Sequence, residues 1–168
     1  MQVKDLKKVF ENKSNPNPIR YTLNEEGLID NITDGYMLLK NTLFDLQVTK
    51  YTLGKRDFLE AKKELFVNAT PRRATVKVKK SRIMYECVQG RTKYLSRVWY
   101  TDEGEVILIQ EKFTPFLPDK MYMGDRAGQV RLIDTTDGEN MSILVMPVTT
   151  YALMEDLKKL KIEEIACK

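Results

Sequence analysis

Residues 74–111 have the sequence ATVKVKKSRIMYECVQGRTKYLSRVWYTDEGEVILIQE, and this stretch decides the expected fold. Apolar Ala74, Val76 and Val78 alternate with polar side chains, which is the period of a strand with one face in the core. Turn compositions at 89–91 and 102–104 separate the segments that follow. Further strands are predicted at about 82–89, 93–100 and 105–111.

Amphipathic helices are predicted outside this stretch, at 2–12, 55–66 and 150–166, from the spacing of their apolar residues. Strands are predicted at 19–23, 28–33, 36–48, 129–135 and 141–147, and residues 112–126 are expected to form a loop. This order predicts an α+β fold: one antiparallel sheet with two helices on one face, plus a C-terminal helix. The expected organisation is one domain over 1–148 and a helical tail over 149–168.

The composition excludes several classes of function. The 168 residues are 42% apolar and 31% charged, which is typical of a globular domain, and none is histidine. Ser-His-Asp and Cys-His catalysis and the usual zinc ligand are therefore absent, so no catalytic residue, metal or cofactor is expected. Cys87 and Cys167 are too far apart for a CxxC motif, and two lone thiols indicate a reducing compartment. Without a secretory signal or a long apolar run, we expect a cytoplasmic protein with no membrane partner.

Positive charge is concentrated in one part of the chain. The net charge is +4, but residues 72–97 contain nine basic side chains and one acid, Glu86. The basic residues are Arg72, Arg73, Lys77, Lys79, Lys80, Arg82, Arg91, Lys93 and Arg97. Such a surface attracts phosphate backbones, and Tyr94 and Trp99 are candidate platforms for base stacking. The alternative is a solvated strand face kept soluble by its lysines.

Both ends of the predicted domain resemble a known family. Leu6-Lys7-Lys8, Ile19-Arg20-Tyr21-Thr22-Leu23-Asn24 and Thr33-Asp34-Gly35-Tyr36-Met37-Leu38 resemble the first helix and two strands of a domain of the bacterial DNA polymerase III beta sliding clamp. Val145-Met146-Pro147-Val148 is similar to the closing strand of that domain. The resemblance implies a single clamp-like domain and a role in replication or in a mobile element.

In the clamp family, the two matching strands line an apolar pocket for short peptides of replication and repair proteins. The resemblance therefore implies a peptide-binding site at Thr33, Gly35, Tyr36, Met37, Leu38, Val145, Met146, Pro147 and Val148. Tyr36-Met37 stands where the family usually has His-Arg, so we expect a more apolar pocket. The alternative is that these residues are ordinary core.

Clamp helices line the inside of a ring around duplex DNA, which they contact through phosphates without sequence preference. The implied DNA-binding residues are Lys4, Lys7, Lys8, Lys55, Arg56, Lys62 and Lys63, to which the strand residues Lys77, Lys79 and Arg91 are added. A ring would need a homo-oligomer of six copies, since one chain has room for one domain. The alternative function is a basic nucleic-acid-binding protein that uses the 72–97 strand surface and does not encircle DNA.

An enzyme is a third interpretation. Asp30, Asp34, Asp134 and Asp137 carry carboxylates of the kind that hold Mg²⁺ in phosphoryl-transfer sites. The Asp-Gly sequences at 34–35 and 137–138 explain two of them as turn residues, and no nucleotide-binding or catalytic motif accompanies them. The sequence therefore favours a non-enzymatic binding protein.

Overall fold

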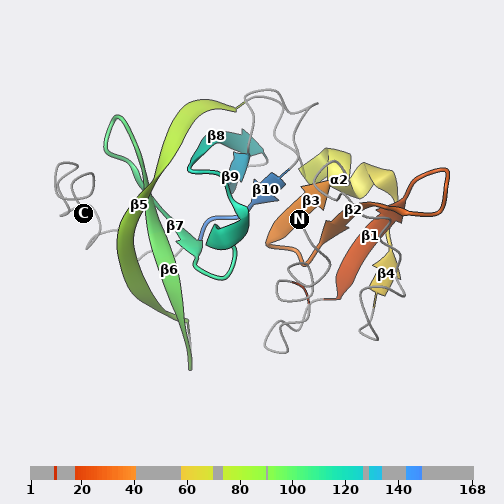
Figure 1. Cartoon of the computed structure of the whole chain (residues 1–168), viewed down its shortest axis with the longest axis horizontal. Coiled ribbons are helices and arrows are strands. Elements are labelled where there is room, and N and C mark those ends of the chain that lie inside the picture. Colours follow the sequence, from red (N-terminus) through yellow and green to blue (C-terminus); the bar gives the residue numbers. More distant parts are fainter. Residues whose placement is uncertain are drawn as a thin grey trace.

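The computed structural model describes residues 10, 18–40, 58–69, 74–89, 91–126, 129–133 and 143–148 (Figure 1). Its strands are β1 (Ile19–Leu23), β2 (Ile29–Thr33), β3 (Met37–Lys40), β4 (Phe58–Glu60), β5 (Ala74–Gln89), β6 (Thr92–Thr101), β7 (Val106–Gln110), β8 (Lys120–Arg126), β9 (Gln129–Ile133) and β10 (Ile143–Val145). The helical elements are α2 (Lys63–Ala69) and a 3-10 turn, η2 (Thr114–Phe116). Phe10 is also helical.

The ten strands form one continuous run of pairings in the order β4-β1-β2-β3-β10-β9-β8-β5-β6-β7. All neighbours are antiparallel except β1 and β4, which are parallel. The pairing of β3 with β10 joins the early strands to the late ones. Beyond β10, the Val148 N–H donates to the Leu108 carbonyl of β7 at 2.8 Å. The last six strands therefore curl until their two ends meet.

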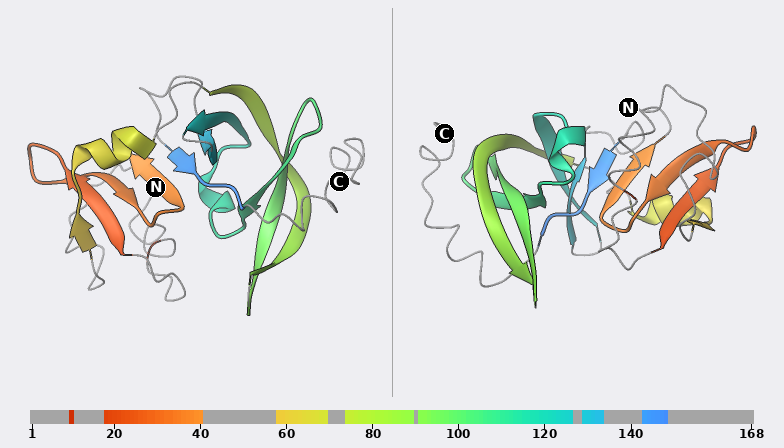
Figure 2. Two further views of the ribbon diagram at one scale, coloured as in Figure 1. Left: turned by 180° about the vertical axis from the view of Figure 1, so that it is seen from behind. Right: turned by 60° about the horizontal axis from the view of Figure 1, so that its bottom comes forward.

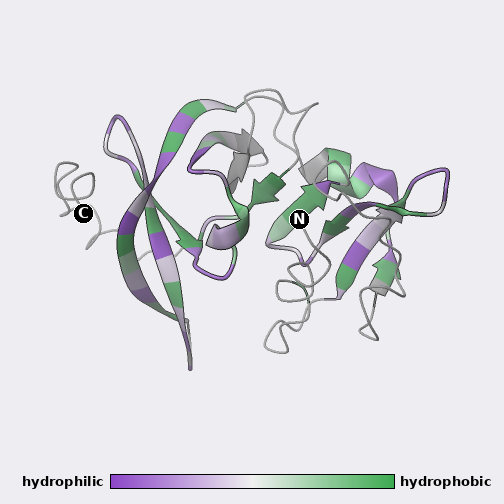
Figure 3. Cartoon of the chain, viewed as in Figure 1, coloured by the Kyte–Doolittle hydropathy of each residue, from purple (hydrophilic) through white to green (hydrophobic). Residues whose placement is uncertain are grey.

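The molecule has two lobes, which are visible from both sides (Figure 2). One contains β1–β4 and α2, and the other contains β5–β9 with η2. The long β5–β6 hairpin extends beyond the other strands of its lobe (Figures 1 and 2). Purple and green alternate along this hairpin in Figure 3, as expected for strands with one polar and one apolar face.

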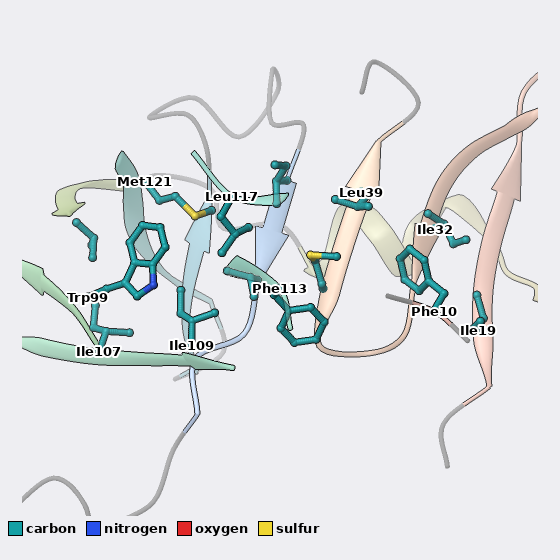
Figure 4. Close-up of a cluster of buried hydrophobic side chains, with 14 of the residues drawn as sticks. Phe10, Ile19, Ile32, Leu39, Trp99, Ile107, Ile109, Phe113, Leu117 and Met121 are labelled. Atoms are coloured by element: carbon teal, nitrogen blue, oxygen red, sulfur yellow. The ribbon is translucent and has the colours of Figure 1, made fainter. Parts of the chain in front are cut away.

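The largest apolar cluster crosses from one lobe to the other (Figure 4). Trp99 and Met121 lie at one end of it, Phe10 and Ile19 at the other, and Phe113 lies between them. All five are buried. Two smaller clusters flank the sheet: α2 contributes Phe66 to one, and Val148 packs against the other, beside Val98 and Leu108. The lobes therefore share one core, with β10 in its middle.

The α+β prediction is wrong, because the described residues are mostly strand. The predicted helix at 55–66 is replaced by β4 and the seven-residue α2, which begins only at Lys63. The predicted loop at 112–126 contains η2 and strand β8, whose Met121 and Gly124 are buried although its sequence lacks a clear two-residue period. The predicted helices at 2–12, apart from Phe10, and at 150–166 lie outside the described residues, as does the whole 149–168 tail.

Candidate functional site

The two segments of the clamp resemblance lie side by side in the fold. Met37 is opposite Val145 and Leu38 is opposite Leu144 in the β3–β10 ladder. One residue further on, the Met146 N–H donates to the Tyr36 carbonyl at 2.7 Å. Residues 146–148 then cross to β7. The strand pairing therefore brings 33–38 and 143–148 side by side.

A tight turn before β3 positions Tyr36 beside Met146. The buried Asp34 carboxylate accepts the N–H groups of Tyr36 and Met37, both at 2.9 Å through Oδ1. The Thr33 hydroxyl accepts the Gly35 N–H at 3.0 Å. Gly35 has φ of +89°, which residues with a Cβ rarely adopt. Asp34 and Gly35 together therefore fix the backbone that carries Tyr36.

A cleft lies where these segments meet. It encloses about 110 Å³ and is lined by Tyr36, Tyr94, Gln110, Phe113, Met146, Pro147 and Val148. Six of its seven lining residues are aromatic or aliphatic, but the surface that the lining exposes to the cleft is more polar than apolar. A cavity of about 150 Å³ holds a benzene molecule, so this one is large enough for a single side chain. Tyr36 is 41% exposed and forms an accessible wall.

Lys112 contacts the two rings, Tyr36 and Phe113, that form one wall of the cleft. Its ammonium lies 4.5 Å from the ring centre of Phe113 and 5.7 Å from that of Tyr36, both within cation–π range. The same nitrogen is 4.0 Å from Oδ2 of Asp34. Burial lowers the pKa of Lys112 below its ordinary value, while the Asp34 carboxylate acts to raise it. A single lysine thus links the turn before β3 to the segment after β7.

The other residues of the predicted peptide site do not line the cleft. Met37 and Val145 are fully buried in the largest cluster, and Leu38 packs with Phe66 on the other side of the sheet. Thr33 and Gly35 belong to the turn that supports Tyr36. Of the nine predicted residues, Tyr36, Met146, Pro147 and Val148 line the cleft directly.

Sequence reasoning did not assign Tyr94, Gln110, Lys112 and Phe113 to this site. The sequence offers Tyr94 as a stacking platform or as a core residue, and Phe113 falls where no periodic pattern is visible. The β6–β7 pairing and the turn after β7 bring these residues to the cleft. A signal was present in the Phe113-Thr114-Pro115-Phe116 sequence, which is rich in apolar residues for a loop.

Acidic side chains neutralise much of the basic stretch at 72–97. Ion pairs join Lys79 to Asp102, Lys80 to Asp119, Lys93 to Glu86 and Arg97 to Glu111. Three of the four acids lie outside the stretch, so its excess charge did not reveal them. Lys77, Arg82 and Arg91 are exposed, and none has an ion-pair partner within the described ranges.

The remaining predicted DNA-binding residues are only partly described. Lys62 and Lys63 are exposed at the start of α2. Lys4, Lys7, Lys8, Lys55 and Arg56 lie outside the described residues.

The aspartates considered for magnesium do not gather in the part of the chain that is described. Asp30 accepts a hydrogen bond from the Asn31 amide, and Asp34 is committed to its turn. Asp134 and Asp137 lie outside the described ranges. Among the described residues, no group of three or more His, Cys, Asp or Glu side chains could hold a metal ion.

Within the same residues, no helix has the length and apolar character needed to cross a bilayer. Comparisons with protein-family models, with curated proteins and with solved structures gave no match for this chain.

Proposed function

We propose that this protein is a non-enzymatic, cytoplasmic peptide-binding module. Its cleft beside β3 and β10 takes up one apolar side chain of a short partner segment. The observation that carries the proposal is the convergence of Tyr36 and Met146–Val148 on one cleft of about 110 Å³. An aliphatic anchor in such a cleft can supply most of the affinity of a short peptide.

The proposed partners are peptides of replication or repair proteins. The support for this class is the resemblance of 33–38 and 145–148 to the peptide-binding strands of sliding clamps. The cleft fits an apolar anchor better than a charged one, because Lys112 is already engaged with Asp34 and two rings. Gln110 can hydrogen bond to the backbone of the bound segment.

The test is a selection of binding peptides from a random displayed library, followed by Kd measurements with the best peptide. Tyr36→Ser and Val148→Ser should each raise Kd by at least about tenfold, because each removes an apolar wall of the cleft. Val67→Ser is the matched control, since Val67 is exposed on α2, away from the cleft lining. Equal affinity in all three variants, with unchanged folding by circular dichroism, would contradict the proposal.

Non-specific binding of duplex DNA is a second candidate function, and the exposed Lys77, Arg82 and Arg91 favour it. Lys77→Gln should weaken binding to a duplex oligonucleotide at low salt and reduce the salt dependence. Lys79 lies two positions further along the same strand and is already neutralised by Asp102. Lys79→Gln should therefore weaken DNA binding less than Lys77→Gln does. An identical effect of the two substitutions would show that this strand surface does not select phosphates through its unpaired cations.

A further inference from the structure

The distal part of β5, residues 81–89, is an open strand edge. β6 pairs with Met84–Gln89 on one side, while residues 81–83 form an irregularity with no opposite residue on β6, and β8 pairs with β5 only over Ala74–Lys79. The described strands therefore provide no partner for the second edge of 81–89. Within this segment the Ile83 N–H donates to the Ser81 hydroxyl and the Ser81 carbonyl accepts from Arg97. Unpaired N–H and C=O groups along the rest of an edge favour the addition of another strand.

One face of this ribbon combines exposed apolar side chains with the charged side chains of Glu86, Lys93 and Arg97. Met84 and Val88 of β5, with Leu95 of β6, are 37%, 56% and 54% exposed. They lie on the same face, because Met84 is opposite Arg97, Glu86 opposite Leu95 and Val88 opposite Lys93. The opposite face holds Ile83 and Tyr85, which are partly buried beside Cys87.

The edge is complementary to itself. When two β5 strands pair antiparallel about a two-fold axis through Met84, Arg82 of each copy faces Glu86 of the other. On the opposite face, Ile83 of each copy faces Tyr85 of the other, a favourable pairing of β-branched and aromatic side chains. A two-fold interface repeats each contact twice, so the register gives two ion pairs and two apolar pairs around a Met84–Met84 contact.

Neighbouring two-fold registers fit less well. An axis through Glu86 places two carboxylates opposite each other, and an axis through Tyr85 places Met84 against Glu86. In the register through Met84, Arg82 is exposed without an ion-pair partner in the described residues, and Glu86, which already pairs with Lys93, is half exposed and has a second carboxylate oxygen for Arg82 of the other copy. The β5–β6 register shifts between Lys80 and Met84, so Arg82 has no opposite residue on β6.

We propose that this protein forms a two-fold dimer by antiparallel pairing of the β5 edge over 81–89, and that the occupant of the edge is a second copy of the chain. This inference goes beyond the peptide-binding proposal and does not depend on it, because neither Arg82 nor Glu86 lines the cleft.

Sedimentation equilibrium of the full chain tests the dimer. The wild type should reach twice the chain mass of 19.6 kDa as its concentration rises. Arg82→Glu places four acids at the interface and Glu86→Arg places four cations there, so each should raise the dimer Kd by roughly tenfold or more. Glu103→Arg, the same charge change at an exposed turn, should leave Kd within about threefold.

Mixing the two variants gives the decisive result. An Arg82→Glu chain and a Glu86→Arg chain have two attractive pairs in the mixed dimer and only repulsive pairs in either homodimer. The mixture should therefore dimerise at concentrations where each variant alone is monomeric. A wild type that stays monomeric, a mixture that stays monomeric, or a Kd equally sensitive to Glu103→Arg would overturn the proposal.

A covalent readout checks the axis itself. Met84→Cys, in a Cys167→Ser background, should form an intermolecular disulfide on mild oxidation, because the residue on the axis faces itself. Val88→Cys in the same background should not, since its symmetry mate lies several residues away along the partner strand. Equal crosslinking of both variants would contradict the register.

Discussion

The Lys112 ammonium lies 4.0 Å from the carboxylate of Asp34, whose side chain is only 1% exposed. The same carboxylate holds the N–H groups of Tyr36 and Met37, so one buried acid organises both the turn and the lysine above it. Tyr36 and Phe113, the two rings beneath Lys112, are walls of the cleft. Asp34 is therefore a positioning residue for the candidate site.

Asp34→Ala should destabilise the protein by about 1–3 kcal/mol, because the buried N–H of Met37 loses its acceptor. Urea denaturation followed by circular dichroism measures this change. Asp34→Asn keeps an amide oxygen for the turn and loses the charge beside Lys112, so its cost should be smaller. Asp30→Ala is the control at a half-buried acid nearby, and a loss as large as that of Asp34→Ala would refute the special role of Asp34.

Gly35→Ala should separate stability from binding. At φ of +89° an added Cβ costs about 1–2 kcal/mol, and the strain falls on the turn that carries Tyr36. Gly27→Ala, at φ of +75° in the turn between β1 and β2, carries a similar strain with no atom within 4 Å of the new Cβ. Both variants should lose similar stability, whereas only Gly35→Ala should weaken the selected peptide. Equal peptide affinities would remove Gly35 from the site.

The strands were largely visible in the sequence, because a half-buried strand leaves a two-residue period. Ile19–Leu23 was predicted with the bounds that the structure has. β8 was not predicted because the residues before it are typical of turns and Gly124 interrupts its two-residue period. Met121 of β8 nevertheless packs in the main core. The prediction of a helix at 55–66 was wrong because Phe58–Glu60 pairs with β1. This long-range strand pairing outweighs the local preference for a helix that the apolar spacing indicated.

Only part of the cleft lining could be predicted from the sequence, because long-range contacts bring in the rest. Tyr36 and Met146–Val148 carry a family resemblance, but Tyr94 and Phe113 enter through the fold of β6 and the turn after β7. The charge pattern misled in the same way. Arg97 looked like part of a cationic surface, and its partner Glu111 becomes its neighbour through the β6–β7 pairing, which continues to the Glu111 N–H and the Leu95 carbonyl.

The Arg97–Glu111 pair should make stability depend on acid pH. The guanidinium donates to both carboxylate oxygens, at 2.6 and 2.9 Å, and lowers the pKa of Glu111 below its ordinary value of 4.5. A carboxyl whose pKa is lower in the folded state contributes stability above 4.5, which is lost as the pH falls through the folded pKa. Urea denaturation of the wild type between pH 6 and about pH 3 should therefore show this loss.

Glu111→Gln isolates the contribution of that pair, because Asp102 and Asp119 also have lowered pKa values from their lysine partners. The variant should be less stable than the wild type at pH 6, and the difference should shrink toward pH 3. Glu105→Gln, at an exposed acid without an ion pair among the described residues, should follow the wild-type curve. A constant difference between the Glu111→Gln variant and the wild type at all pH values would contradict the linkage.

Trp99 combines full burial with an indole N–H that has no acceptor among the described residues. An unsatisfied buried donor costs about 1–3 kcal/mol, and Trp99→Phe removes that cost while it leaves a cavity. The two effects oppose each other, so the substitution should cost less than about 1.5 kcal/mol in urea denaturation. Phe113→Leu, at a buried aromatic without a polar atom, should cost more. A loss above about 3 kcal/mol for Trp99→Phe would contradict this expectation.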